Sequence, residues 1–203
     1  MRKIVVSEFL TLDGVMQAPG SPDEDRDGGF PYGGWQRQFS FDEAQMKKIG
    51  EGMQSTDAYL FGRRTYEIMA AHWPNQPDTD MFAAVLNPRP KYVVSRTLSE
   101  PLSWQNSHLI NDNVVDRLRE LKNQDGGAIS VLGSGDLVQT LIKNDLVDEL
   151  ALIVHPLVLG TGKRLFRDGL DAQKFELVDS TPGEDGVILN YRPREAYQPA
   201  GAS

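Results

Sequence analysis

The chain has 203 residues, of which 39% are hydrophobic and 25% charged, a composition typical of one soluble globular domain. Its formal net charge of -8 argues against nucleic-acid binding, which needs a basic face, and the absence of cysteine excludes thiol nucleophiles and cysteine-based zinc sites. Glu8 interrupts the short N-terminal apolar run, and no segment approaches the roughly 18 apolar residues of a membrane span. We therefore expect a cytoplasmic protein without a signal peptide or membrane segment.

The first part of the chain is expected to alternate strands with helices. An apolar strand over 4–12 ends in a Leu-Asp-Gly turn, and a loop rich in Gly, Pro and Asp follows over 17–34. The segment 42–53 predicts a helix with Ser40 or Asp42 as its cap. Further strands are expected at 58–61, 91–94, 109–110, 128–132 and 150–159, and further helices after 62, at 81–86, at 112–122 and over 137–142.

The order of these elements predicts an α/β fold. Strands that alternate with helices favour parallel pairing through crossovers, whereas the last two strands, at 175–178 and 187–191, follow one another without a helix. We expect one domain over residues 1–194, with a central, mostly parallel mixed sheet, an antiparallel C-terminal hairpin and flanking helices. Residues 195–203 are expected to form a flexible tail.

Three turns with similar chemistry follow three of the expected strands, at 62–65, 95–97 and 133–136. Ligands of an open parallel sheet bind at the carboxyl ends of the strands, so these turns could share one edge. Arginine forks, hydroxyl groups and two helix N-termini suit a pyrophosphate and an additional phosphate. The candidate cofactor-binding residues are Gly62, Arg63, Arg64, Thr65, Ser95, Arg96, Gly133, Ser134, Gly135 and Asp136.

Simple nucleotide-binding motifs do not match these turns. The turn at 133–135 lacks a Rossmann fingerprint, because Val138 occupies the position of the third glycine. The turn at 160–163 is not a Walker A loop, since Arg164 stands where Ser or Thr should hold magnesium. Read singly, a glycine pair is more often a structural turn and an arginine more often solvated. The three turns together favour a ligand.

No metal site is expected. Asp23, Asp25 and Asp27 resemble the beginning of a calcium loop, but Gly34 stands where the closing glutamate belongs. The three histidines are scattered without metal-ligand spacing. Of these, His155 follows an apolar run and is more readily interpreted as a core or edge residue than as a catalyst.

The order and spacing of these segments resemble the dihydrofolate reductase-like superfamily, in particular the branch that contains the reductase domain of the bacterial riboflavin-biosynthesis deaminase-reductase. The resemblance covers residues 4–192. The segments that carry it are the first-strand turn at 12–14, the Gly-Arg-x-Thr-aromatic-Glu segment at 61–67, the 2′-phosphate turn at 94–96, the pyrophosphate turn at 132–135 and the branch-specific stretch at 147–160.

The resemblance implies a three-layer dihydrofolate reductase-like fold, NADPH bound by the turn residues, and a homodimer. It implies reduction of a C=N or C=O bond of a small heterocycle or ribosylamino-pyrimidine, as in the 5-amino-6-(5-phosphoribosylamino)uracil reductase of riboflavin biosynthesis. Asp13 ends a central strand at the ligand edge and is a candidate catalytic residue in contact with the substrate, with a structural Asp-Gly turn as the alternative. Trp35 is expected beside the substrate, with packing as the alternative. Dihydrofolate reductases place a carboxylate on the helix after the first loop to help protonate the pterin. Asp42 or Glu43 could fill that role, although a count back from the second strand gives Met46.

Two alternatives remain open at this point. One is dihydrofolate reduction itself. The other is a nucleotide-binding sensor without turnover, since the sequence offers no clear proton donor. The absence of cysteine excludes the zinc deaminase activity that accompanies the riboflavin enzyme.

Overall fold

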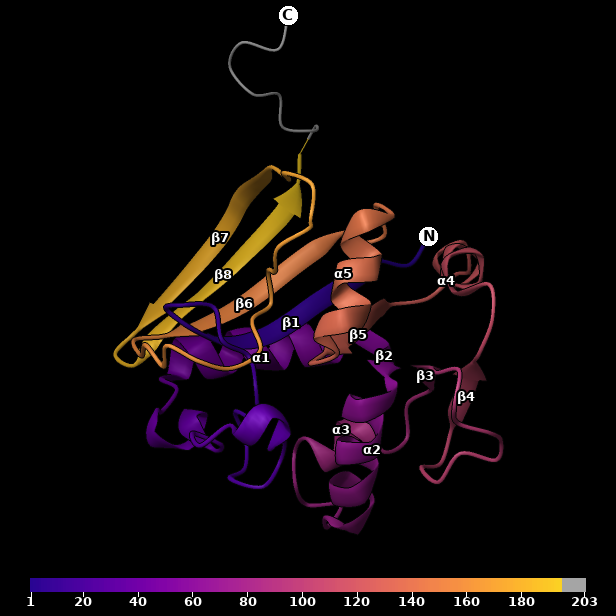
Figure 1. Cartoon of the computed structure of the whole chain (residues 1–203), viewed down its shortest axis with the longest axis horizontal. Helices are drawn as coiled ribbons and strands as arrows, with labels where there is room; N and C mark the ends of the chain where they lie inside the picture. The colour runs from indigo at the N-terminus through magenta and orange to yellow at the C-terminus, as the bar shows by residue number, and fades with distance from the viewer. Residues whose placement is uncertain (195–203) are drawn as a thin grey trace, which may run out of the picture.

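The computed structural model describes residues 1–194, so the predicted tail at 195–203 lies outside the described residues. Within them, an eight-stranded sheet runs in the order β4-β3-β2-β5-β1-β6-β8-β7 (Figure 1). The strands are β1 (Ile4–Thr11), β2 (Thr56–Gly62), β3 (Lys91–Val94), β4 (Ser107–Ile110), β5 (Ala128–Leu132), β6 (Glu149–His155), β7 (Phe175–Gly183) and β8 (Gly186–Pro193). The helices are α1 (Glu43–Ser55), α2 (Arg63–His72), α3 (Ala83–Leu86), α4 (Val114–Lys122) and α5 (Gly135–Lys143), with short 3₁₀ turns η1 (Asp27–Gly29), η2 (Trp35–Gln38) and η3 (Trp73–Asn75).

The strand pairing confirms the predicted mixed sheet. Strands β1 to β6 pair in parallel, whereas β8 is antiparallel to both β6 and β7. The predicted continuation of the sixth strand to residue 159 is wrong. Strand β6 ends at His155 because Pro156 has no N–H to continue the ladder, and the N–H of Leu157 turns back to the His155 carbonyl at 2.8 Å.

Helices α4 and α5 cover one face of the sheet, and α2 and α3 cover part of the other. Helix α5 packs through Leu137, Val138, Leu141 and Ile142, a helical stripe of which no member is more than 6% exposed. Burying such side chains contributes roughly 1.5–3 kcal/mol each. This packing fixes the N-terminus of α5, and the glycine turn before it, against the sheet. No helix within residues 1–194 is long and apolar enough to cross a membrane.

Helix α1 lies on the face of the sheet opposite α5 (Figure 1). Gln45 is its only buried residue, and the Gln45 side-chain amide donates to the carbonyl of Gly186 at 3.2 Å. The apolar side chains of Met46, Ile49 and Met53 instead line a cavity between α1 and the sheet. The fold thus leaves space beneath this helix.

A crevice opens where β1 and β5 separate. The β1–β5 ladder ends at the pair Ser7 and Leu132, whereas β1 continues to pair with β6 as far as Thr11 and His155. Glu8 is therefore the first residue of β1 beyond the β5 ladder. The helices that follow β1 and β5 lie on opposite faces of the sheet, which is the arrangement at which α/β sheets bind ligands.

Candidate active site

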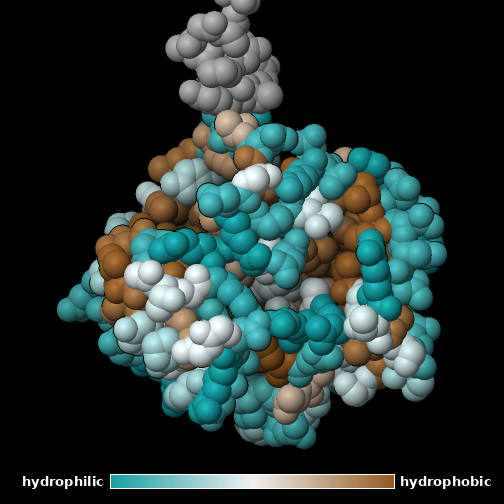
Figure 2. All heavy atoms as spheres, in the orientation of Figure 1, coloured by the Kyte–Doolittle hydropathy of each residue, from teal (hydrophilic) through white to brown (hydrophobic). Residues whose placement is uncertain are grey.

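One cavity of about 2100 Å³ runs along the carboxyl ends of β2, β3 and β5 and continues between α1 and the sheet. Figure 2 shows a hollow on this side of the molecule, bordered mainly by hydrophilic residues. The structure brings all the sequence-predicted cofactor residues to the wall of this cavity; their binding of a cofactor stays a prediction. They are Gly62, Arg63, Arg64, Thr65, Ser95, Arg96, Gly133, Ser134, Gly135 and Asp136.

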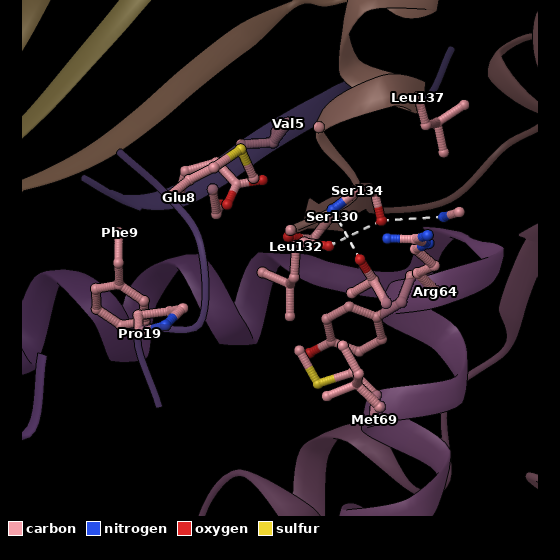
Figure 3. Close-up of a pocket in the computed structure, with 18 of the residues that line it drawn as sticks. Val5, Glu8, Phe9, Pro19, Arg64, Met69, Ser130, Leu132, Ser134 and Leu137 are labelled. Atoms are coloured by element: carbon pink, nitrogen blue, oxygen red, sulfur yellow. Dashed lines mark hydrogen bonds between the residues drawn. The ribbon is translucent and has the colours of Figure 1, made fainter. Parts of the chain in front are cut away.

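The turns after β2 and β5 are joined through Ser134. Its hydroxyl accepts from the N–H of Gly62 at 3.0 Å and donates to the carbonyl of Leu132 at 3.1 Å, while its own N–H donates to the Thr65 hydroxyl at 2.9 Å (Figure 3). Gly133 has a φ of +58°, and a Cβ there would lie 3.0 Å from Thr65. Glycine therefore allows the two turns to meet.

The N-terminus of α5 faces this cavity without a side-chain cap. Ser134 is the N-cap residue, and its side chain makes no hydrogen bond to the first turn of the helix. The first N–H groups of a helix have no partner within it and carry the positive end of the dipole. Gly135 and Asp136 line the cavity at this point. This turn therefore has the donor set that phosphate groups require.

The three candidate arginines differ in their partners. Arg63 pairs with Glu67 on its own helix at 2.8 Å, and Arg64 pairs with Asp27 from η1. Arg96, which follows β3, forms no ion pair with any residue that the structure describes. Arg96 is therefore the arginine whose charge is most available to an anionic ligand.

Asp13 does not line the cavity, so the structure gives no support to the expectation that it contacts the substrate, which stays a prediction. Its carboxylate accepts from the Thr11 hydroxyl at 2.6 Å and from the N–H groups of Leu159 and Gly160 at 3.2 and 2.9 Å, and it pairs with Arg164. Burial works to raise the pKa of Asp13, but these hydrogen bonds outweigh it and lower the pKa to about 2. Asp13 is therefore ionised, and its hydrogen bonds connect the turn after β1 with the loop after β6.

Asp42 and Trp35 are also placed outside the cavity wall. Asp42 is the N-cap of α1, where its carboxylate accepts from the N–H of Gln45 at 2.9 Å. Trp35 is 4% exposed and packs in an apolar cluster with Val15 and Phe30, while its indole N–H donates to the carbonyl of Gln17 at 2.8 Å. Helix capping and core packing account for these two side chains, so this placement gives no support to the proton-donor and substrate-contact expectations, which stay predictions.

Glu8 is a site residue that the sequence analysis did not identify. It lies on β1 between Val6 and Leu10, on a strand face that otherwise belongs to the hydrophobic core, and it is 6% exposed. Its side chain lines the cavity, and Oε1 is buried without a hydrogen-bond partner in the part of the chain that the structure describes (Figure 3). Burial raises the pKa of Glu8 well above its ordinary value, although the Gly133 backbone acts in the opposite direction. The available signal was one acidic residue in an otherwise apolar strand row.

Comparison with known families gives a direct match over most of the chain. Residues 2–189 match the family model of the RibD C-terminal domain. The chain belongs to this family. It is 28% identical over 194 residues to the uncharacterised protein YyaP of Bacillus subtilis, covering 92% of each chain. YwjB of the same organism is 29% identical over 140 residues, which cover 68% of this chain and 74% of YwjB.

Solved structures show the dihydrofolate reductase-like fold. A protein of Shewanella sp. PV-4 assigned to riboflavin biosynthesis has a TM-score of 0.72 at 20% identity and covers 95% of this chain and 99% of its own. Dihydrofolate reductase from Enterococcus faecalis, complexed with NADP(H), gives 0.59 at 13% identity, with 95% and 97% covered. The Thermotoga maritima deaminase and 5-amino-6-(5-phosphoribosylamino)uracil reductase gives 0.62 at 14% identity, and this chain spans 57% of its length. Family and fold together indicate a reductase-like domain.

Proposed function

We propose that the protein is an NADPH-dependent oxidoreductase that reduces a C=N or C=O bond of a small heterocycle or ribosylamino-pyrimidine. The observation that carries the proposal is the meeting of three phosphate-type turns, after the neighbouring strands β3, β2 and β5, along one cavity. This cavity lies at the carboxyl ends of parallel strands and reaches the β1–β5 crevice, where α/β sheets bind ligands.

The cofactor's phosphates fit two parts of this wall. The free N–H groups at the start of α5 and the close backbone approach at Gly133 suit the pyrophosphate. Arg96, next to Ser95 at the end of β3, has no ion-pair partner within residues 1–194. It suits a 2′-phosphate because its guanidinium can donate two parallel hydrogen bonds. When bound there, the cofactor supplies the hydride, and the chain orients it and excludes water.

The space beneath α1 suits a flat substrate. It is lined by aromatic and aliphatic side chains from both α1 and the sheet, a setting typical of ligand pockets. The volume of about 2100 Å³ can hold both a dinucleotide and a second small molecule. The apolar lining residues are Phe9, Phe41, Met46, Ile49, Met53, Ile153 and Ile188.

Quenching of tryptophan fluorescence tests the cofactor assignment. We expect NADPH to bind more tightly than NADH, and Arg96→Ala to lose more of this preference than Arg63→Ala, because Arg63 is already paired with Glu67. Removal of a bidentate phosphate contact costs on the order of tenfold or more in affinity. Failure of the wild-type chain to bind either nucleotide would refute the proposal.

The same chain can then be assayed for NADPH oxidation with two compounds, 5-amino-6-(5-phosphoribosylamino)uracil and 7,8-dihydrofolate. Turnover of the first supports the proposal as stated, whereas turnover of the second alone supports the alternative of dihydrofolate reduction. A nucleotide-binding sensor is the remaining alternative, favoured by the use of Asp42 as a helix cap. Tight NADPH binding without oxidation over both compounds would favour that sensor.

We also propose a homodimer and a cytoplasmic location. Both rest on the family to which the chain belongs. Light scattering of the purified protein tests the first, since a monomer at all accessible concentrations would refute it. Fractionation of cells that express the native chain tests the second.

A further inference from the structure

Glu8 stands at the point where the two parts of the cavity meet. It follows the last β1–β5 pair, Ser7 and Leu132, so the edge of β1 that faces β5 is open beside it. The Gly133 backbone lies close enough to affect its carboxyl group, which places Glu8 next to the proposed pyrophosphate turn. The next residue, Phe9, lines the apolar space beneath α1. The Glu8 carboxyl group therefore lies at the open edge of β1 beside the proposed pyrophosphate turn, and the Phe9 side chain leaves the opposite face of the same strand toward α1.

Packing alone does not account for a glutamate at this position. Val6 and Leu10, two residues away on the same strand face, are 0% and 4% exposed and belong to the main hydrophobic core. An apolar residue would satisfy that environment, whereas a buried carboxyl oxygen without a partner costs stability. A residue that is costly in the fold and aimed into a cavity points to a role in ligand chemistry.

Four other carboxylates that line the cavity near Glu8 are already engaged. They lie in the loop after β1 and at the start of α5, where cations or backbone N–H groups hold them. Asp25 and Asp27 pair with Lys163, Asp136 pairs with Arg167, and Glu24 accepts from the N–H groups of Gly20 and Ser21. Among the described residues Glu8 has no cationic partner and its Oε1 has no hydrogen-bond partner, although the Gly133 backbone acts on the carboxyl group. Burial is the larger effect and favours its neutral, proton-bearing form.

We propose that the Glu8 carboxyl group donates the proton that completes reduction of the substrate, an inference that rests on the proposed function. For a C=N bond, the substrate carbon receives the hydride with its two electrons from the reduced nucleotide, which leaves oxidised. The π bond breaks, the substrate nitrogen takes the proton as the Glu8 O–H bond breaks, and an amine results. The Glu8 carboxylate then regains a proton from solvent.

The test compares the wild-type chain with Glu8→Gln and Glu8→Met. Both variants keep nearly the volume of glutamate but cannot donate a carboxyl proton, and methionine suits the apolar row if the amide impairs folding. We expect turnover of NADPH with whichever of the two assay compounds the wild type reduces to fall by on the order of 100-fold or more, with NADPH affinity little changed. The matched control is Glu176→Gln, an exposed glutamate of β7 that pairs with Arg194 and should behave as the wild type.

A second measurement does not depend on turnover. If Glu8 stays protonated in the fold, the unfolded chain releases this proton at a lower pH than the folded chain does. The free energy of unfolding of the wild type should therefore fall relative to that of Glu8→Gln as pH rises above about 4.5. A constant stability difference across this range would overturn the inference, as would wild-type turnover in both variants. A wild-type chain that oxidises NADPH with neither compound would instead refute the proposed function, and this inference with it.

Discussion

The side chain of Ser134 ties together two turns that are far apart in the sequence. Its hydroxyl accepts from the N–H of Gly62 at 3.0 Å, across a separation of 72 residues, so the start of α2 is positioned by the start of α5. The backbone of Ser134 adds a second link to Thr65. The turns after β2 and β5 therefore form one hydrogen-bonded unit, and a change in either turn should affect both.

Ser134→Ala removes one side of this link. The N–H of Gly62 then loses its partner, which we expect to destabilise the fold by about 1–3 kcal/mol and to weaken NADPH binding on the order of tenfold. Urea unfolding and a fluorescence titration measure the two effects. Ser180→Ala, at an exposed position of β7, is the control and should change neither. Unchanged NADPH affinity in Ser134→Ala would contradict the coupling of the turns.

Gly133→Ala tests the close approach of the two turns. Its φ of +58° alone costs an L residue roughly 1–2 kcal/mol, and the new Cβ would also lie 3.0 Å from Thr65. Gly14→Ala is the matched control, because Gly14 has a φ of +77° but no atom within 4 Å of a new Cβ. We expect Gly133→Ala to lower stability more than Gly14→Ala and, unlike it, to weaken NADPH binding. Equal effects of the two variants would show that contact with Thr65 is unimportant.

The sequence located the three turns because their position follows from the alternation of strands and helices. Once β2, β3 and β5 are read as parallel, their carboxyl ends must share one edge, whichever residues make the detailed contacts. The same reasoning placed the antiparallel hairpin at the C-terminus. These predictions depend on periodicity and turn chemistry, which local sequence carries well.

The individual roles of polar side chains were harder to predict. Asp13 and Asp42 have the residue type expected of catalytic carboxylates, but both hold backbone N–H groups at the ends of elements. Capping and catalysis use the same chemical group, and only three-dimensional placement distinguishes them. Glu8 was missed for the opposite reason, since its burial depends on where β5 separates from β1.

Asp13→Asn should weaken the fold rather than the proton chemistry. The carboxylate accepts from two backbone N–H groups and pairs with Arg164. In asparagine an NH₂ group replaces one of the carboxylate oxygens, so it would face one of these donors instead of accepting from it. With its pKa at about 2 in the fold, Asp13 stabilises the native state above the ordinary aspartate value of 3.8, and this contribution, on the order of 2 kcal/mol, is lost as pH falls through about 2. Acid titration of unfolding in wild type and variant measures it. If the free energy of unfolding of Asp13→Asn depends on acid pH as that of the wild type does, the carboxylate of Asp13 does not stabilise the contact between the turn after β1 and the loop after β6.

Asp27→Asn should release Arg64 toward the cavity. Asp27 pairs with both Arg64 and Lys163, and all three side chains are at least 33% exposed, so its loss should change stability by less than about 1 kcal/mol. Removing one negative charge and one competitor for Arg64 should strengthen NADPH binding, most visibly at low salt. Titrations at two ionic strengths, with Asp23→Asn as the control for net charge, test this. Weaker binding in Asp27→Asn would contradict the expectation.

His155 should make the fold sensitive to mild acid. The ring is 1% exposed, stacks on Phe39 with centroids 4.7 Å apart, and lies beside Phe9 and Phe41, which line the substrate space. Nδ1–H donates to the carbonyl of Asp185 at 2.9 Å, and Nε2 has no partner among residues 1–194. Burial lowers the pKa of His155, although the Asp185 carbonyl and carboxylate oppose this.

The sign of the effect follows from this lowered pKa. Above the ordinary histidine value of 6.5 both states are neutral, but below it the unfolded chain takes up a proton that the folded chain resists. The free energy of unfolding should therefore fall as pH drops below about 6.5. His155→Phe should remove this dependence, while costing some stability at higher pH because the Asp185 carbonyl loses its donor. His108→Phe, at an exposed position of β4, should leave the dependence intact. Urea unfolding at several pH values measures this dependence. Equal pH dependence in wild type and His155→Phe would show that another group causes it. Loss of the dependence in His155→Phe would show that protonation of this one imidazole weakens the packing beneath α1.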